Sequence, residues 1–218
     1  MKNLTNLREK MVQDQIISRG VQDEVVLNAM RKVPRHLFVP IEYQLHAYDD
    51  RPLPIGYDQT ISQPYIVALM SEMLQLQPED IVLEVGTGSG YQAAVLGCLV
   101  SKVYTIERHG PLAQKAAKIL RSSGFTNVTV IEGDGSLGFP DKAPFDAVII
   151  TAAAPALPKP ICSQLKRGGR IVLPVGNRWE QNLQLWRKMP DDQLEFEKHI
   201  PVSFVPLRGE HGWRESEW

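Results

Sequence analysis

The chain has 218 residues, of which 43% are hydrophobic and 22% are charged, and its formal net charge is −1. No stretch approaches the ~18 uncharged apolar residues of a membrane span, and Cys98 and Cys162 lie far apart with no CxxC motif, so a transmembrane protein and a disulfide-rich one are excluded. Lys and Arg are interspersed with Asp and Glu, so the basic footprint of a nucleic-acid-binding protein is missing.

The N-terminal segment 1–9 lacks the apolar core of a secretion signal. The expected compartment is therefore the reducing cytoplasm. The five histidines show no metal-ligand spacing, so no metal site is expected. We expect a monomer that has neither nucleic acid nor a membrane as a partner.

The first 75 residues are predicted to be mainly helical. Apolar residues recur at helical spacing over 3–20, and Gly20 is the expected end of that helix. A second helix is predicted to begin after Asp23, a good N-cap, and to end at Pro34. The segment 34–64 holds five prolines and has no clean period, and a long irregular stretch inside a compact domain is often functional. A third, strongly apolar helix follows it.

Strands and helices alternate from residue 80 onward. The predicted strands are 81–85, 103–106, 128–131, 145–150 and 170–173, with helices after the first and over 111–122. This alternation predicts parallel strands with right-handed crossovers, hence a doubly wound, mostly parallel α/β sheet. The segments 182–189 and 194–205 alternate in polarity on either side of a Pro-Asp-Asp turn and predict an antiparallel hairpin at the sheet edge.

The whole chain, 1–218, is predicted to be a single domain. Within it, we expect 1–75 to form a helical segment beside a substrate cleft, 78–180 the cofactor-binding core, and 181–213 the C-terminal hairpin with a substrate-side strand. The tryptophans are interpreted as packing or edge residues: Trp179, Trp186, Trp213 and Trp218.

Gly86, Gly88 and Gly90 follow a predicted strand and enter a predicted helix. Without Cβ atoms they let the chain turn sharply and let a ligand rest against the backbone. A dinucleotide fingerprint is G-x-G-x-x-G, but the sixth position here is Tyr91. Glu84, two residues before the loop, would repel a pyrophosphate. S-adenosylmethionine has no phosphate and carries a sulfonium and an ammonium, so the loop favours that ligand.

Two more acids end predicted strands. Glu107 lies about twenty residues beyond the glycines, where a carboxylate can accept hydrogen bonds from both ribose hydroxyls. Asp134 stands between two glycines and is predicted to accept from the adenine amino group, with Gly135 letting the ring approach the backbone. The alternatives are a solvated strand-end acid for Glu84, a surface acid for Glu107 and an ordinary Asp-Gly turn for Asp134.

Seven segments along the chain, one of which contains the glycine loop, carry a resemblance to a known family. They are 31–40, 51–56, 59–64, 82–94, 151–155, 168–176 and 204–207. In these segments the chain resembles the protein-L-isoaspartate O-methyltransferase family, from about residue 4 to 213. The most specific of them is Thr60-Ile61-Ser62-Gln63-Pro64, which generic methyltransferases do not carry.

The resemblance implies a seven-stranded methyltransferase sheet with a reversed final hairpin. It also implies methyl transfer from S-adenosylmethionine to the free α-carboxylate of L-isoaspartyl residues in damaged proteins and peptides, leaving S-adenosylhomocysteine. Ser62 matches the family's active-site serine. The predicted cofactor contacts are Thr60, Ile61, Glu84, Gly86, Thr87, Gly88, Ser89, Gly90, Glu107, Asp134 and Gly135. The predicted substrate contacts are Gln59, Ser62, Val205, Pro206 and Leu207.

The chain departs from the family pattern in three places. Asp58 stands where glycine is usual and is expected to add charge beside the substrate cleft. Arg167 replaces a usual proline in a loop, and the tail 214–218 runs past the usual end. Of these, Asp58 is the departure expected to affect substrate binding.

The implied chemistry needs no general base. A free α-carboxyl has a pKa of roughly 3.3–3.7, so only about one in 10³ is protonated at pH 7. Ser62 is therefore predicted to position the carboxylate by hydrogen bonding. Its alternative role is a helix N-cap, since Pro64 follows two residues later.

Three other functions are considered. They are a methyltransferase for a small molecule or an RNA base, a nicotinamide-dependent oxidoreductase, and a non-catalytic cofactor-binding protein. The segment 60–64 argues against the first and Tyr91 against the second. The third would follow if Asp58 spoiled the acceptor cleft.

Overall fold

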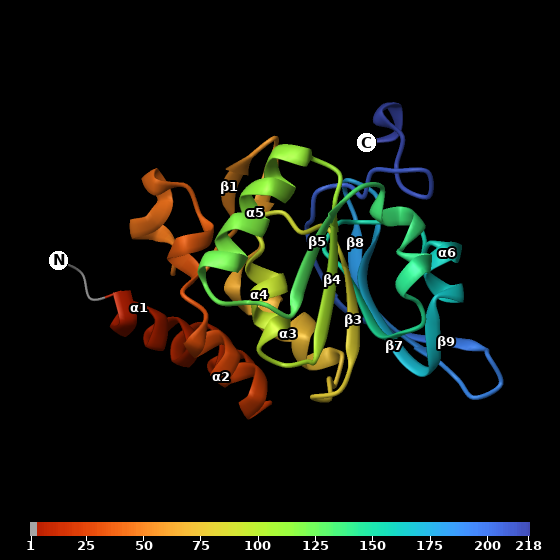
Figure 1. The fold of residues 1–218 in the computed structure, drawn as a ribbon, viewed down its shortest axis with the longest axis horizontal. Coiled ribbons are helices and arrows are strands. Elements are labelled where there is room, and N and C mark those ends of the chain that lie inside the picture. Colours follow the sequence, from red (N-terminus) through yellow and green to blue (C-terminus); the bar gives the residue numbers. More distant parts are fainter. Residues whose placement is uncertain (1–3) are drawn as a thin grey trace.

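A seven-stranded sheet forms the centre of the molecule (Figure 1). The computed structural model describes residues 4–218. The strand order is β5-β4-β3-β6-β7-β8-β9; the first five are parallel, and β8 and β9 are antiparallel. The strands are β3 Ile81–Val85, β4 Lys102–Glu107, β5 Val128–Glu132, β6 Phe145–Ile150, β7 Leu165–Gly176, β8 Gln181–Lys188 and β9 Leu194–Pro201. The predicted doubly wound sheet with its antiparallel hairpin is confirmed.

Helices cover both faces of this sheet (Figure 1). The helices are α1 Leu4–Met11, α2 Glu24–Lys32, α3 Pro64–Met73, α4 Tyr91–Gly97, α5 Gly110–Ser122 and α6 Lys159–Ser163. Strand side chains alternate between the faces, so Val82 joins the apolar cluster under α1 to α5, and Leu83 joins the cluster that includes α6. Within residues 4–218, no helix has the length and apolar character needed to cross a bilayer.

The N-terminal helix changes type before it ends. After α1, a π-helical turn covers Val12–Ile16 and a 3-10 turn covers Ile17–Arg19. Gly20 has a φ of 93° and ends the helix as predicted, since glycine adopts the left-handed conformation without strain. The predicted start at residue 3 lies outside the described residues.

The second helix begins and ends where the sequence predicts. The Asp23 carboxylate accepts hydrogen bonds from two amides in the first turn of α2, the normal action of an N-cap. Val33 has extended backbone, as residues before proline generally do. Pro34 therefore terminates the helix.

The segment 34–64 is more regular than predicted. It contains two 3-10 turns and a two-stranded hairpin: Arg35–Phe38, Ile41–His46, β1 Leu53–Gly56 and β2 Gln59–Ile61. The expectation of a wholly irregular stretch is therefore wrong. The prolines conceal the hairpin in the sequence, and its two-residue turn at Tyr57 and Asp58, both at φ 55°, carries no glycine at its centre to reveal it.

The C-terminal hairpin forms as predicted, but its second strand is shorter. β9 ends at Pro201, whereas the polarity pattern predicted residue 205. Residues 202–207 leave the sheet edge and cross towards β6. There the Ala153 amide donates to the Val205 carbonyl oxygen at 2.8 Å. Hydrogen bonds to residues at the ends of other strands determine the path of 202–207, so the local polarity pattern does not predict it.

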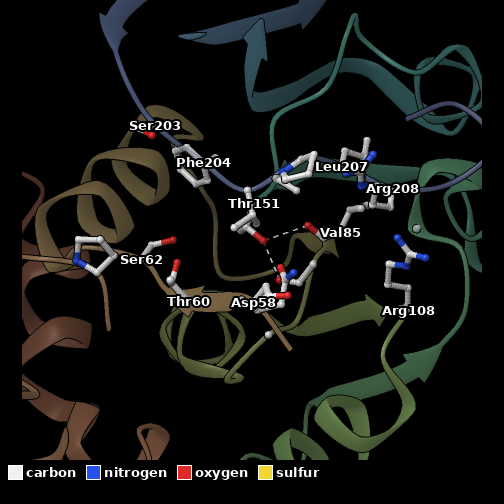
Figure 2. A pocket seen from close by; sticks show the side chains of 18 of the residues that line it. Asp58, Thr60, Ser62, Val85, Arg108, Thr151, Ser203, Phe204, Leu207 and Arg208 are labelled. Atoms are coloured by element: carbon white, nitrogen blue, oxygen red, sulfur yellow. Dashed lines mark hydrogen bonds between the residues drawn. The ribbon is translucent and has the colours of Figure 1, made fainter. Parts of the chain in front are cut away.

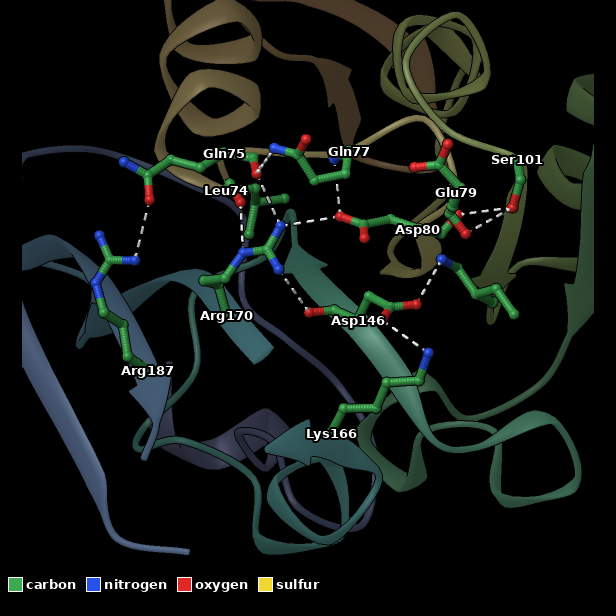
Figure 3. A network of polar contacts seen from close by, with 11 residues as sticks. Leu74, Gln75, Gln77, Glu79, Asp80, Ser101, Asp146, Lys166, Arg170 and Arg187 are labelled. Atoms are coloured by element: carbon green, nitrogen blue, oxygen red, sulfur yellow. Dashed lines mark hydrogen bonds and ion pairs between the residues drawn. The ribbon is translucent and has the colours of Figure 1, made fainter. Parts of the chain in front are cut away.

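A polar network closes the edge of the sheet opposite the glycine loop (Figure 3). The Arg170 guanidinium on β7 donates to the carbonyl oxygen of Leu74 at 2.6 Å, and to that of Gln75 and the Asp80 carboxylate, each at 2.9 Å. The Arg170 side chain is 14% exposed. These bonds tie the end of α3 to the sheet.

Replacing Arg170 with methionine should lower the free energy of unfolding by about 2 kcal/mol, since the buried Asp80 carboxylate loses its charged partner. Urea unfolding measures this loss. Arg187→Met is the matched control, because Arg187 donates to Gln75 Oε1 from an exposed position and should contribute less than about 1 kcal/mol. Equal losses in the two variants would contradict a special role for Arg170.

Candidate active site

One crevice of about 1050 Å³ lies at the carboxyl ends of β3, β4 and β6 (Figure 2). Strand ends are where parallel sheets bind ligands. The predicted site residues that line it are Gln59, Thr60, Ser62, Gly86, Gly88, Glu107, Gly135, Val205, Pro206 and Leu207. The predicted site residues outside its lining are Ile61, Glu84, Thr87, Ser89, Gly90 and Asp134.

The glycine loop forms one wall of the crevice. Gly86, Gly88 and Gly90 have φ values of 96°, 51° and 86°, which glycine adopts without strain. A Cβ atom on Gly86 would lie 2.5 Å from Thr151 Oγ1. That hydroxyl donates to the Gly86 carbonyl oxygen at 2.6 Å (Figure 2). Thr151, just after β6, therefore fixes the loop and leaves no room for a side chain.

Glu107 ends β4 and lines the crevice beside this loop. Its Oε2 accepts from the Gly88 amide at 2.8 Å and its Oε1 from the His109 amide at 2.9 Å. These two bonds fix the carboxylate orientation. Each oxygen retains a lone pair, since a carboxylate has about four acceptor sites. The geometry thus leaves Glu107 free to accept from two ribose hydroxyls, its predicted role.

Asp134 lies behind the crevice lining, so the prediction that it faces an adenine ring needs correction. Its Oδ1 accepts from the amide and hydroxyl of Ser136, and its Oδ2 accepts from the Glu210 amide at 2.8 Å. Burial opposes ionisation, but these hydrogen bonds outweigh it and lower the pKa of Asp134. Gly135 lines the crevice instead; a Cβ there would lie 2.5 Å from Val85 Cγ1.

Glu84 also departs from its predicted place. Its side chain is wholly buried, and neither carboxyl oxygen has a hydrogen-bond partner within residues 4–218. Strand alternation explains this: Val85 lines the crevice, so Glu84 points to the opposite face of the sheet, the face that Val82 shares with α1 to α5. The buried Glu84 is therefore neither a solvated acid at the strand end nor placed to contact the methyl donor directly. Burial, and secondarily the Glu107 charge, raises the pKa of Glu84 to about 8.

The other predicted cofactor residues outside the lining shape the elements around it. The hydroxyls of Thr87 and Thr105 share a hydrogen bond of 2.6 Å. Ser89 Oγ accepts from the Tyr91 amide at the start of α4. Ile61 is 3% exposed and belongs to the core. Their side chains therefore hold the loop and β2 in place.

Ser62 follows β2 and lines the crevice, as Thr60 does (Figure 2). The N-cap of α3 is Gln63, and it makes no side-chain capping bond. The alternative of Ser62 as the helix cap is therefore wrong. No hydrogen bond engages the Ser62 hydroxyl within the described part of the chain, residues 4–218. It is free to bind a ligand.

The segment 202–207 forms the wall opposite Ser62 (Figure 2). Gln181, at the start of β8, holds it with its side-chain amide. The Gln181 Oε1 accepts from the Phe204 amide at 2.7 Å, and its Nε2 donates to the Phe204 carbonyl oxygen at 3.2 Å. One crevice thus joins the glycine loop, Ser62 and the predicted peptide-side residues.

The sequence profile of the protein-L-isoaspartate(D-aspartate) O-methyltransferase family matches residues 6–212. The chain belongs to this family. Relatives named protein-L-isoaspartate O-methyltransferase include one from Trichlorobacter lovleyi, 51% identical over 98% of this chain and 99% of the relative. Another, from Roseiflexus castenholzii, is 53% identical over 97% of this chain and 96% of the relative.

Solved structures agree with this assignment. A protein-L-isoaspartate O-methyltransferase, 29% identical, superposes with a TM-score of 0.84 over 94% of this chain and 67% of that one. A beta-aspartate methyltransferase from Plasmodium falciparum, in complex with S-adenosyl-L-homocysteine, has a TM-score of 0.81 over 95% and 99% of the two chains. It is 22% identical and therefore supports the fold alone.

Asp58 lies in the β1–β2 turn with left-handed backbone. Glycine suits such a position, and aspartate tolerates it better than most residues do. The neighbouring Tyr57 ring lies 5.6 Å from the His109 ring, so the turn reaches the end of β4. Asp58 therefore lines the crevice at its glycine-loop end, whereas the sequence analysis placed its charge at the substrate side.

The sequence does not predict the roles of three features of the site. Thr151 stands in the family-like segment 151–155, but its bond to Gly86, like that of Gln181 to Phe204, joins segments far apart in sequence, so no local pattern predicts these roles. The tail beyond residue 212, where the family match ends, also reaches the crevice. Arg208 Nη1 donates to the Trp213 and Arg214 carbonyl oxygens, which folds the tail back and brings Glu215 and Trp218 into the lining.

Proposed function

We propose that this chain transfers the methyl group of S-adenosylmethionine to the free α-carboxylate of L-isoaspartyl residues in damaged proteins and peptides. The observation that carries the proposal is the single crevice that joins the glycine loop to Ser62 and the 202–207 wall. A donor and an acceptor held in one crevice can react without crossing solvent. Family membership supports the same activity and sets the oxidoreductase alternative aside.

The residues of the glycine-loop end fit S-adenosylmethionine. Gly86 and Gly135 line the crevice, and a Cβ on either would clash with its neighbour, so backbone is exposed to a flat ligand there. Glu107 keeps free lone pairs for two hydroxyls. When bound, S-adenosylmethionine supplies a methyl group carried on a sulfonium. Thr60 and Gly88, which also line this end, would contact it.

The chain's own residues then have to position an acceptor that is already ionised. A hydrogen bond to the attacking oxygen would weaken it as a nucleophile. We therefore assign the Ser62 hydroxyl to the other carboxylate oxygen, which it would hold while the first attacks. Gln59 and the Val205–Leu207 stretch would contact the peptide. Proximity and orientation of this kind can contribute roughly 7–11 kcal/mol to catalysis.

Ser62→Ala should lower kcat on an isoaspartyl peptide by about 10- to 100-fold, because the carboxylate loses its orienting bond. Binding of S-adenosylhomocysteine and the melting temperature should change little, since Ser62 caps no helix. The matched control is Ser203→Ala, an exposed hydroxyl across the same crevice (Figure 2). Unchanged turnover in Ser62→Ala, or an equal loss in Ser203→Ala, would reject the positioning role.

The proposed activity is tested with labelled S-adenosylmethionine and a pair of peptides that differ only in an isoaspartyl or aspartyl linkage. Label should enter the isoaspartyl peptide alone, as an ester that mild base releases. Label in neither peptide, with S-adenosylhomocysteine still bound, would favour a non-catalytic binding protein. Stable label on a small molecule or RNA base would favour a different acceptor.

We also propose that the chain acts as a monomer in the cytoplasm and without nucleic acid. The net charge of −1, with no basic run, supports the absence of a nucleic-acid partner. Light scattering on the purified protein tests the monomer, and a mass near twice that of the chain would reject it.

A further inference from the structure

The loop between β7 and β8, residues 177–180, lies on the same sheet edge as the crevice. Arg178 lines the crevice together with the nearby wall residues Val202 and Ser203. Asn177 Oδ1 accepts from the amides of Trp179 at 2.8 Å and Glu180 at 3.0 Å. This turn fixes the loop by local hydrogen bonds, so Arg178 is presented on an ordered support.

Three arginines line the crevice: Arg108, Arg178 and Arg208. Arg178 is the one whose guanidinium has no polar or charged partner within residues 4–218. Arg208 donates to carbonyl oxygens of the tail, and the charge of Arg108 contributes to lowering the pKa of Asp134. No carboxylate within residues 4–218 forms an ion pair with Arg178. Its guanidinium instead lies over the Trp179 ring, 5.5 Å from the ring centroid.

Trp179 does not pack into the core, which leaves the edge position as the other role that the sequence predicts for it. It is 87% exposed, the most exposed of the large hydrophobic side chains in residues 4–218. Trp186, by comparison, stacks on Phe196 with ring centroids 4.4 Å apart. Tryptophan and arginine are both among the residue types enriched at the energetic centres of binding sites.

A stacked arginine has a defined chemical preference. The aromatic ring covers one face of the guanidinium and leaves its N–H edge open, and that edge matches a carboxylate with two parallel hydrogen bonds. A carboxylate that binds Arg178 would come from outside the chain, because no carboxylate within residues 4–218 is paired with it. A peptide bound along the 202–207 wall is the ligand that passes this position.

We propose that Arg178 and Trp179 form a subsite for an acidic residue that flanks the isoaspartyl residue in the substrate peptide. The Trp179 ring supports the backbone or side chain of that neighbour, and Arg178 binds its carboxylate. This inference rests on the proposed isoaspartyl methyltransferase activity, and it adds a charge preference that the family assignment does not contain.

The test uses isoaspartyl peptides that differ at one flanking position, with Glu, Gln or Lys there, in one series before and one series after the isoaspartyl residue. In at least one series the wild-type chain should prefer Glu over Lys by roughly 3- to 10-fold in kcat/KM, mainly through KM. Added salt should reduce the preference, since the pair is exposed. Arg178→Glu should reverse it, and Arg178→Gln should abolish it.

Two controls keep the test specific. Arg121→Glu makes the same charge change on the exposed surface of α5, outside the crevice lining, and should leave the preference as in wild type. Trp179→Ala should raise KM for all peptides. An identical Glu-to-Lys ratio in wild type and Arg178→Glu, in both series, overturns the subsite. Failure of wild type to methylate any isoaspartyl peptide would instead overturn the proposed function.

Discussion

Gly86→Ala is expected to weaken S-adenosylhomocysteine binding by roughly 5- to 150-fold and to lower turnover with it. The φ of 96° is unfavourable for an L-residue, and strain of this kind amounts to about 1–3 kcal/mol. The new methyl group would also meet Thr151 Oγ1 at 2.5 Å. The loop would relax away from this shape, so the ligand would have to restore it on binding. Isothermal titration calorimetry measures the loss.

Two further variants separate the causes. Gly124 has a φ of 85° with open space around it, so Gly124→Ala introduces strain outside the crevice and should leave the affinity intact. Thr151→Ala removes the clashing oxygen, so Gly86→Ala should cost less affinity in that background than in wild type, a coupling that a double-mutant cycle measures. Wild-type affinity in Gly86→Ala would show that the ligand does not use this loop.

The sheet was predictable because its elements are locally encoded. Each buried parallel strand is a short apolar run between turn signals, and the helices carry an apolar face and clear ends such as Asp23 and Gly20. The β1–β2 hairpin was missed because its signals are weak: prolines interrupt the strand, and the turn holds Tyr57 and Asp58 where glycine or asparagine would announce it. The path of 202–207 depends on distant partners and has no local signature.

The site, too, contains residues that the sequence predicts correctly and residues that it misplaces. Gly86 and Glu107 could be found from spacing, because their roles follow from the strand-loop-helix order. Glu84 and Asp134 have the residue type and spacing that the prediction required. However, Glu84 points to the opposite face of its strand from Val85 and is buried, and the Asp134 carboxylate accepts a hydrogen bond from the Glu210 amide. Whether an acid at a strand end faces a ligand depends on contacts that spacing alone does not specify.

Glu84→Gln should stabilise the ligand-free chain at alkaline pH. Burial raises the folded-state pKa of Glu84 to about 8, whereas an unfolded glutamate titrates near its ordinary value of about 4.5. Between these values the folded state holds a proton that the unfolded state releases, so wild-type stability falls as pH rises, by at most about 1.4 kcal/mol per pH unit. Above pH 8 the whole penalty is present, about 5 kcal/mol. A glutamine never ionises and avoids it.

The measured quantity is the difference in unfolding free energy between Glu84→Gln and wild type, from urea titrations at pH 5 to 9. This difference should grow with pH and level off above about 8, because all other titrating groups are common to both proteins. Glu79→Gln, at an exposed position, should show no such growth. A flat difference would mean that Glu84 ionises freely in the folded state. Its carboxylate would then have to contact water or a cation, and the prediction that Glu84 contacts the methyl donor would stand.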